Sequence, residues 1–367
     1  MTIFSVLFGI LLFSLLILGH ELGHFTAAKA FGVQVNEFSL FMGPVLWKKQ
    51  KGETLYSLRL IPIGGFCEME GENGDSISPR AFTASPWWKR LVILVAGPVM
   101  NLVMGFVLFL CFFAPQERYI VPVVDHVERG SAVGAFDEDE VGLKQGDRIL
   151  EVDGSKVYMY NDFELLLIAN TDQETNPENK HDLVLLRDGE KVELKDFPMQ
   201  KRTFQEEDGS TSLRYGFNFG RVERTFFNLL GQTWNAVLSN VRMVYISLQM
   251  LLTGKARFTD MSGPVGIVQK MTETSAQSSS LYYAFLNMLS FGGLISVNLG
   301  IMNLLPIPAL DGGRSLGVVL TALVEGITRK KINPKYEGYI HGAGMIVLLA
   351  LMALIMFNDC LRIFLRS

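Results

Sequence analysis

The stretch from Leu91 to Pro115 reads LVILVAGPVMNLVMGFVLFLCFFAP and contains no charged residue. A helix needs roughly 20 apolar residues to cross about 30 Å of hydrocarbon. Three more runs are free of charge, at Met1–Gly19, Thr274–Leu310 and Gly338–Asn358. The first reaches the required length if the helix continues through the His and Glu residues that follow, and the third includes a polar lead-in at Thr274–Ser280. These runs predict a polytopic α-helical membrane protein with four transmembrane helices.

The overall composition supports this class of protein. Only 19% of the 367 residues are charged, against about 25% in soluble domains. Four buried helices of a soluble core would rarely go so far without a charge. The 33 Lys+Arg and 37 Asp+Glu residues leave no basic excess, so no nucleic-acid partner is expected. Three cysteines are too few for a disulfide framework or a four-thiolate zinc site.

The placement of positive charge predicts the topology. No basic residue precedes the first apolar run, as one would before a cleavable signal peptide. Short loops rich in Lys and Arg stay on the cytoplasmic side. Such residues lie between the first two spans and between the last two, among them Lys48, Lys49, Arg329 and Lys330. Both loops are therefore expected in the cytoplasm, and both chain termini outside it.

The segment between the second and third spans is acidic. Glu117–Arg221 holds 13 Lys+Arg and 23 Asp+Glu, a net charge of −10. Its apolar residues alternate with turn sequences, which predicts a soluble β-rich domain of about 100 residues on the outer side. Thr225–Leu252 then has helical apolar spacing with few charges. This stretch could lie on the membrane, pack against the β-rich domain, or be an ordinary amphipathic core helix.

These patterns divide the chain into four parts. Residues 1–116 form the first part of a membrane core, with a β-hairpin loop at about 33–70 between its two spans. Residues 117–222 form the inserted β-rich domain. Residues 223–273 link it to the membrane core through amphipathic helices, and residues 274–367 complete that core.

A metal-site motif stands at the end of the first span, His20-Glu21-Leu22-Gly23-His24. Positions i and i+4 share one helix face, so His20 and His24 can both present a ring nitrogen to one zinc ion. The carboxylate of Glu21 is placed to act as a general base on a water at that metal. Ionisable side chains in a membrane span are costly unless they pair, bind metal or line a wet cavity. A solvated helix end is the plainer alternative.

A catalytic zinc site usually has a third protein ligand and one open position. Asp311 is the best candidate, because two prolines and two glycines in Asn303–Gly313 break the helix and let backbone approach a ligand closely. Taken alone, Asp311 could equally cap the end of a span. His341 in the fourth run is a rival ligand, whereas His126 and His181 fall in the outer domain, on the wrong side of the membrane.

Several motifs in order resemble the site-2 protease family of intramembrane zinc metalloproteases, most nearly its bacterial regulator-of-sigma-E protease group. Leu143–Gly154 also looks like the core of a PDZ domain. The matching segments, which span nearly the whole chain, are His20–His24, Ile63–Phe66, Ala96–Asn101, Ser262–Ile267 and Asn303–Gly313.

The resemblance implies a role for each motif residue. His20, His24 and Asp311 would be the zinc ligands, Glu21 would activate the attacking water, and Asn303 would contact the substrate backbone. Members of the family often carry two tandem PDZ domains, whereas this chain has room for one. That domain would either exclude substrates with a bulky outer part or bind an extracytoplasmic peptide, and steric exclusion is favoured because it needs only position.

The first loop is the expected substrate site. A transmembrane helix hides its amides in its own hydrogen bonds, so it must unwind before cleavage, and an exposed strand edge could then bind it as a further strand. Leu55–Phe66 suits that role and supplies Ile61, Gly64, Gly65 and Phe66 as substrate-binding candidates. A plain cytoplasmic hairpin fits the residues equally well. The resemblance implies a membrane-associated β-hairpin.

The combined expectation is a zinc endopeptidase of the bacterial inner membrane that cuts single-span membrane proteins within the bilayer. Its substrates would be trimmed anti-sigma factors or remnant signal peptides; the sequence specifies no oligomeric state. A non-catalytic scaffold presenting a PDZ domain is one alternative, although such a scaffold would not need Glu21. A metal transporter is another, but it would need a further polar path through the spans.

Overall fold

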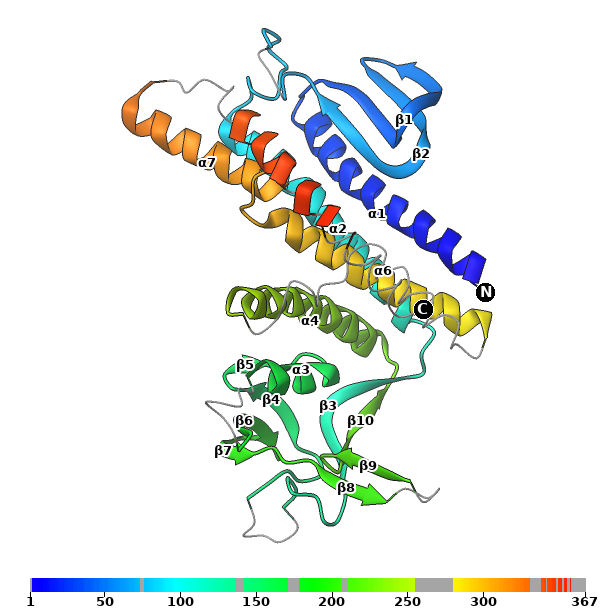
Figure 1. Ribbon diagram of the computed structural model, residues 1–367, viewed down its shortest axis with the longest axis vertical. Helices are drawn as coiled ribbons and strands as arrows, with labels where there is room; N and C mark the ends of the chain where they lie inside the picture. Colours follow the sequence, from blue (N-terminus) through cyan, green and yellow to red (C-terminus); the bar gives the residue numbers. More distant parts are fainter. Residues whose placement is uncertain are drawn as a thin grey trace. The chain divides into compact units, whose positions relative to one another are not determined.

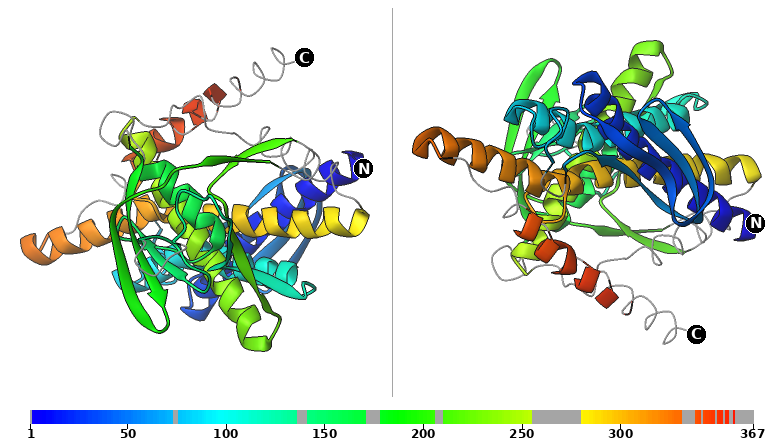
Figure 2. Two further views of the ribbon diagram at one scale, coloured as in Figure 1. Left: turned by 90° about the horizontal axis from the view of Figure 1, so that it is seen from below. Right: turned by 90° about the horizontal axis from the view of Figure 1, so that it is seen from above.

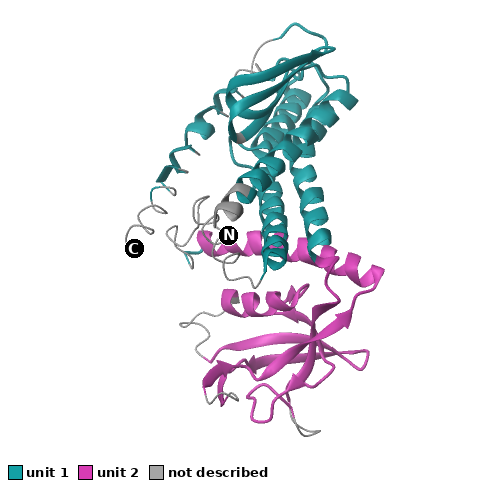
Figure 3. Cartoon of the chain, turned by 90° about the vertical axis from the view of Figure 1, so that its right-hand side faces the viewer, with its two compact units in different colours: residues 1–112, 253–367 teal, residues 113–252 magenta. Residues whose placement is uncertain are grey.

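The structure is a computed structural model of the chain, and it divides into two compact units (Figure 3). One unit comprises residues 1–112 and 253–367, and the other comprises residues 113–252. Each is described by itself. The described residues are 2–72, 76–135, 141–170, 178–205, 210–254, 280–330, 338–340, 342–347, 349–351, 353–354 and 357.

Three helices in the described part of the chain are long and apolar enough to cross a membrane. They are the Phe8–Ala30 part of α1 (Thr2–Ala30), α2 (Trp87–Phe113) and α6 (Leu281–Leu304). The side chain of Ser280 caps α6, so this helix starts where the polar lead-in of the third run ends. In the fourth run the apolar helix is shorter, Gly338–Leu351, and passes over residues that are not described. The chain is thus a multi-pass membrane protein.

Close helix contacts hold the membrane unit together. A Cβ on Gly23 of α1 would overlap the carbonyl of Ala96 in α2, so the two backbones approach as only glycine allows. Helices α2 and α6 lie side by side (Figure 1), and the hydroxyl of Ser296 in α6 donates to the carbonyl of Asn101 in α2 at 2.7 Å. This packing holds the first half of α2 against both neighbours.

The first loop forms a long antiparallel hairpin of β1 (Val35–Lys51) and β2 (Thr54–Met69). Both strands bend, and Phe41, Gly43 and Gly64 have positive φ at the bends. As a result, β1 pairs twice with β2 and the hairpin folds into a broader sheet. Figure 1 and the right-hand view of Figure 2 show it alongside α1.

The pairing decides which strand edge is open. Leu55–Leu58 pair with Glu37–Leu40 on one side and with Trp47–Gln50 on the other. The predicted open edge over Leu55–Phe66 is therefore wrong for Leu55–Leu58, because the bend of β1 covers both of their edges. Gly65–Met69 pair only with the start of β1 among the described strands. The edge next to α1 is thus formed by the end of β2.

Part of the hairpin lies beside the apolar part of α1. The hydroxyl of Ser14 is 3.2 Å from the carbonyl oxygen of Pro62, and Ser14 is about 9 Å along the helix from His20 at 1.5 Å per residue. Large apolar side chains on this part of the hairpin are exposed, among them Met42 (47%) and Ile61 (47%). Apolar side chains at the depth of a membrane helix are typical of protein that contacts lipid.

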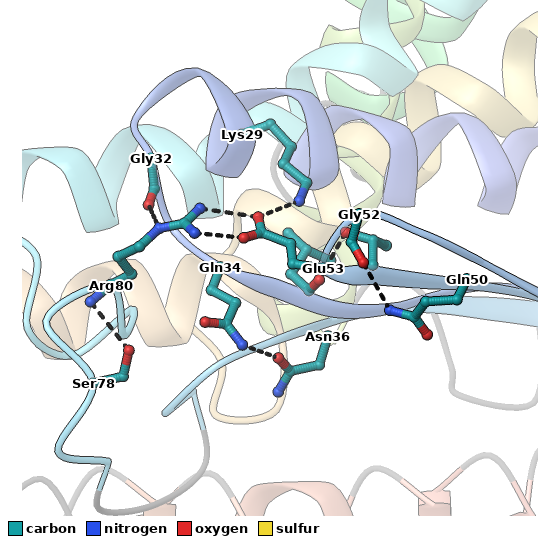
Figure 4. A network of polar contacts seen from close by, with 11 residues as sticks. Lys29, Gly32, Gln34, Asn36, Gln50, Gly52, Glu53, Ser78 and Arg80 are labelled. Atoms are coloured by element: carbon teal, nitrogen blue, oxygen red, sulfur yellow. Dashed lines mark hydrogen bonds and ion pairs between the residues drawn. The ribbon is translucent and has the colours of Figure 1, made fainter.

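The opposite end of the hairpin is tied to α1 by a polar network (Figure 4). Glu53, in the turn between β1 and β2, accepts from Lys29 at 2.6 Å and from Arg80 at 2.5 and 2.9 Å. Arg80 also donates to the carbonyl of Gly32 at 3.0 Å. The turn is therefore anchored to the end of α1 and to the segment that precedes α2.

The second unit is β-rich, as the alternating segment predicts. Its main sheet has the order β10-β3-β4-β6-β7, with β5 paired to β4, and β8 and β9 form a separate ribbon. The elements are β3 (Arg118–Val127), β4 (Arg148–Val152), β5 (Ser155–Lys156), α3 (Tyr160–Asn170), β6 (Lys180–Arg187), β7 (Glu190–Pro198), β8 (Arg202–Gln205), β9 (Thr211–Arg214), β10 (Phe217–Glu223) and α4 (Phe226–Leu252).

Helix α4 belongs to this second unit rather than standing apart from it. Ile246 of α4 is buried in the same apolar core as Phe163 and Leu166 of α3. Ser239 and Arg242 of α4 both bond to the buried carboxylate of Asp162. The unit therefore ends at residue 252, beyond the boundary at 222 expected from the sequence.

Candidate metal centre and active site

Three predicted side chains converge in the membrane unit. Nε2 of His20 lies 3.0 Å from Oδ2 of Asp311, Nε2 of His24 lies 3.3 Å from the same oxygen, and the two ring nitrogens are 3.1 Å apart. Both histidines are at least nine-tenths buried. The geometry thus gathers one potential ligand atom from each of three residues, two on α1 and one at the start of α7 (Asp311–Thr328).

Helix α2 orients the ring of His24. Nδ1 of His24 is 2.8 Å from the carbonyl oxygen of Ile93, which can only accept, so Nδ1 carries a proton and donates it. In the neutral ring Nε2 then has a free lone pair directed at Asp311. A Cβ on Gly97 would overlap this imidazole, so the glycine leaves the space that the ring occupies.

The broken segment before α7 positions Asp311. Leu305–Leu310 turn back on themselves, with Ala309 at φ 88°, and a Cβ on Gly312 would overlap the carbonyl of Leu304. Asp311 is the first residue of α7, where the helix dipole favours a negative side chain. One turn further on, Arg314 forms an ion pair with Glu72, which follows β2. The ligand-bearing helix is therefore tied to the hairpin.

The cluster fits a divalent metal. No N–H or O–H group of the described residues donates to the buried Oδ2 of Asp311, whose nearest polar neighbours are the two imidazole nitrogens. Three lone-pair atoms that face one another repel unless a cation lies between them. Tetrahedral zinc with bonds of about 2.0–2.1 Å sets its ligand atoms about 3.3 Å apart. The observed separations of 3.0 to 3.3 Å are close to that value.

A second carboxylate and the end of β2 lie next to the cluster. Glu21 follows His20 on α1, and a Cβ on Gly65 would be 3.7 Å from Cγ of Glu21. A Cβ there would also be 2.9 Å from the carbonyl oxygen of Ser39, so the backbone of Gly65 packs close to β1. The side chain of Glu21 therefore lies close to the backbone of Gly65 near the end of β2.

The other expected substrate-binding residues are spread over a wider area. Gly64 is buried at a bend with φ 80°, Phe66 stacks on Arg59 with 5.0 Å between ring centroid and guanidinium carbon, and Ile61 is exposed. Asn303 lies half-buried in the last turn of α6 and is not among the three clustered residues.

Other histidines considered as ligands are elsewhere. His126 and His181 lie in the second unit, where His181 is buried and bonds to Asp153 at 2.7 Å. His341 and the Ser262–Ile267 motif fall outside the described residues.

Two groups on α2 lie within hydrogen-bond distance of the histidines and were not expected from the sequence. One is the carbonyl of Ile93, and the other is the side chain of Asn101, whose Nδ2 is 3.2 Å from Nδ1 of His20. The carbonyl leaves no trace in a sequence. A buried amide in a charge-free span is a signal, because polar groups there need partners.

A metal-type cluster with two of its three residues on a membrane helix, and a further carboxylate next to them on that helix, is typical of a membrane-embedded metallohydrolase. Residues 8–351 match the model of peptidase family M50, and the chain belongs to this family of site-2 proteases. It is accordingly a zinc metalloprotease.

The chain is similar to other zinc metalloproteases over nearly its full length. The chain is 34% identical over 363 residues to a provisionally named zinc metalloprotease of Clostridium acetobutylicum, with 98% of both chains covered. It is 26% identical over 447 residues to the regulator of sigma-W protease RasP of Bacillus subtilis, with 98% of this chain and 99% of that protein covered. It is 27% identical over 442 residues to the zinc metalloprotease RasP of Bacillus licheniformis, with 98% and 100% covered.

Proposed function

We propose that the chain is an intramembrane endopeptidase whose zinc is held by His20, His24 and Asp311, with Glu21 as the general base. The observation that carries this proposal is the convergence of three possible ligand atoms. Two are imidazole nitrogens on a membrane helix, and the third is a carboxylate oxygen that accepts no hydrogen bond from the described residues. Such a donor set of two imidazoles and one carboxylate suits a catalytic zinc with an open position.

The chain's own residues supply proton transfer and positioning. When bound, zinc provides Lewis-acid chemistry that polarises a carbonyl and makes water more acidic. Glu21 takes the proton from the attacking water and returns it to the leaving amine, which is the work of a general base and then a general acid. Ile93 holds the ring of His24 through its carbonyl, and Arg314 holds the start of α7 through Glu72.

The substrate binds as an added strand at Gly65–Met69. This edge is open among the described strands, whereas Leu55–Leu58 are paired on both sides. The backbone of Gly65 is close to Glu21, so an unwound peptide on this edge passes beside the general base. Gly64 and Phe66 shape the edge, while Ile61 and Asn303 contact the substrate further from the reacting bond.

The membrane setting follows the charge pattern. The chain spans the bacterial cytoplasmic membrane four times, with the helix at Gly338–Leu351 as part of the fourth span. Both termini are extracytoplasmic, the hairpin enters the membrane from the cytoplasm, and lipid covers its exposed apolar side chains. The β-rich unit is a single extracytoplasmic PDZ domain that excludes substrates with a bulky outer part.

The substrates are single-span membrane proteins already trimmed outside the membrane. Membrane-tethered anti-sigma factors fit, since one similar protein bears the name regulator of sigma-W protease. Remnant signal peptides are also single apolar helices, and they are a second class of substrate for the same site.

The test compares the purified full chain with Glu21→Gln in detergent. Each is assayed for bound zinc and for cleavage of a tagged single-span substrate. We expect about one zinc per chain in both, and a loss of about 10²–10⁴-fold in the cleavage rate of the variant. Glu190→Gln, which changes an exposed carboxylate on β7, is the control and should cut normally.

Two results would contradict the proposal. Full activity in Glu21→Gln would remove this residue as the base. A wild-type chain that binds zinc but cuts no single-span substrate would favour a non-catalytic scaffold.

A further inference from the structure

Asn101 is the most buried polar side chain in α2, at 1% exposure, and it faces the metal-type cluster. Its Nδ2 lies 3.2 Å from Nδ1 of His20, and its Oδ1 has no hydrogen-bond partner among the described residues. A buried amide oxygen without a donor is unfavourable. The orientation of the amide therefore determines whether this oxygen is satisfied.

Metal binding decides that orientation. If Nε2 of His20 is a metal ligand, the neutral ring carries its proton on Nδ1, and Nδ1 is a donor. The NH2 group of Asn101 is also a donor, so the two groups would repel. Half a turn about the Cβ–Cγ bond of Asn101 exchanges Oδ1 and Nδ2. The amide oxygen then accepts from His20, and the orphaned acceptor is satisfied.

We infer that Asn101 is a positioning residue, which accepts the Nδ1–H of His20 through Oδ1 and aims Nε2 at the metal. The inference rests on the proposed zinc site. Both histidines would then donate an Nδ1–H to an acceptor on α2. For His24 the acceptor is the carbonyl oxygen of Ile93. The backbone of Asn101 is itself held by the hydroxyl of Ser296 in α6, so the amide is fixed relative to both helices.

The test measures zinc affinity of the full chain in detergent by competition with a chelator. Asn101→Leu removes the hydrogen bond with little change in volume, and should lower zinc affinity by about 10–100-fold. Asn101→Asp is the rescue variant, because an ionised carboxylate can only accept, and should stay within about threefold of wild type. Asn240→Leu in α4, which removes an amide that donates to the carbonyl of Ala236, is the matched control and should leave zinc affinity unchanged.

The variants separate this role from a structural one. If Asn101→Asp loses zinc as strongly as Asn101→Leu, the amide donates to His20 and the inference is overturned. If neither loses zinc, Asn101 only fills space, and the inference is equally overturned. Should Asn101→Leu fail to fold, the result for Asn101→Asp decides alone. His20→Ala tests the zinc site itself, because a variant that keeps full zinc affinity would refute the ligand set regardless of Asn101.

Discussion

Asp162 in the β-rich unit and Asp311 in the membrane unit have opposite hydrogen-bonding surroundings. In the β-rich unit, Asp162 accepts from two backbone N–H groups at 2.8 and 2.9 Å, from Arg242 at 2.6 Å and from the hydroxyl of Ser239. In the membrane unit, Oδ2 of Asp311 accepts no hydrogen bond from the described residues and faces two imidazole nitrogens. A buried charge without donors is stable only beside a cation.

A second carboxylate in the β-rich unit follows the same rule as Asp162. Asp147 is fully buried, and it accepts from the backbone of Lys144 at 2.8 Å and from two nitrogens of Arg187 at 2.7 Å. The arginine and the carboxylate stabilise each other's charged forms, which raises the pKa of Arg187. These two carboxylates are thus saturated with donors, unlike Asp311, which we propose as a metal ligand.

The largest expected effect comes from Asp311→Asn. Loss of one of three ligands should lower zinc affinity by more than about 100-fold and abolish cleavage. The metal-free variant should be no less stable than metal-free wild type, since the amide removes an unpartnered charge and supplies a donor. Chelator competition and thermal unfolding in metal-free detergent measure the two effects. If Asp311→Asn kept its zinc, or was much less stable than wild type without metal, Asp311 would have a structural role like that of Asp162.

Removing a partner of Asp162 should change the stability of the β-rich unit and not zinc binding. Arg242→Leu leaves the charge of Asp162 buried and only partly paired, which should destabilise the β-rich unit by about 3 kcal/mol. Zinc content should not change. Unfolding of this unit in the full chain can be followed by limited proteolysis, with Arg221→Leu at an exposed position as the control. A loss of zinc in Arg242→Leu would argue against separate roles for the two carboxylates.

The room around His24 gives a smaller effect. In Gly97→Ala the new methyl group overlaps the imidazole, so the ring must shift at a cost of about 1–3 kcal/mol. Both stability and zinc affinity should fall. Gly231→Ala in α4, where nothing described lies within 4 Å of an added Cβ, should instead stabilise by up to about 1 kcal/mol. Thermal unfolding measures the stability of both variants. An equal change in stability would show that the added methyl group at Gly97 does not clash with His24.

The smallest effect concerns a carboxylate at the surface. Hydrogen bonds from Arg80 and Lys29 lower the pKa of Glu53 to about 2. Because the pKa of Glu53 is lower in the folded than in the unfolded chain, its ionised form stabilises the fold at pH values above about 4.5. This contribution is lost as the pH falls from about 4.5 toward 2. Solvent screening limits it to about 1 kcal/mol. Glu53→Gln should flatten the acid side of the stability profile, whereas Glu68→Gln should leave it unchanged.

The sequence predicts most of the membrane unit because its signals are local. Loss of charge over 20 or more residues identifies α2 and α6, and the i, i+4 spacing of His20 and His24 places two ring nitrogens on one face. The helix-breaking context favours Asp311 as the third ligand, and the structure brings this residue to the same point. Each of these conclusions depends on residues that are close in the chain.

Features that depend on long-range pairing could not be predicted. The double pairing of β1 follows from bends at Phe41, Gly43 and Gly64, and it closes the edge at Leu55–Leu58. Periodicity shows which face a strand presents and not which strands flank it. Attachment of α4 to the β-rich unit likewise depends on Asp162, 80 residues before Arg242. Amphipathic spacing alone is the same for a membrane surface and a protein surface.

X-ray absorption at the zinc edge measures whether two histidines and one aspartate hold a single zinc ion. The purified full chain should contain about one zinc with a first shell of nitrogen and oxygen at about 2.0–2.1 Å, including two imidazoles. The same measurement on Asp311→Asn should show little zinc. A sulfur neighbour at about 2.3 Å would point to a cysteine such as the buried Cys67. Either that result or a wild-type chain without zinc would refute this set of ligands.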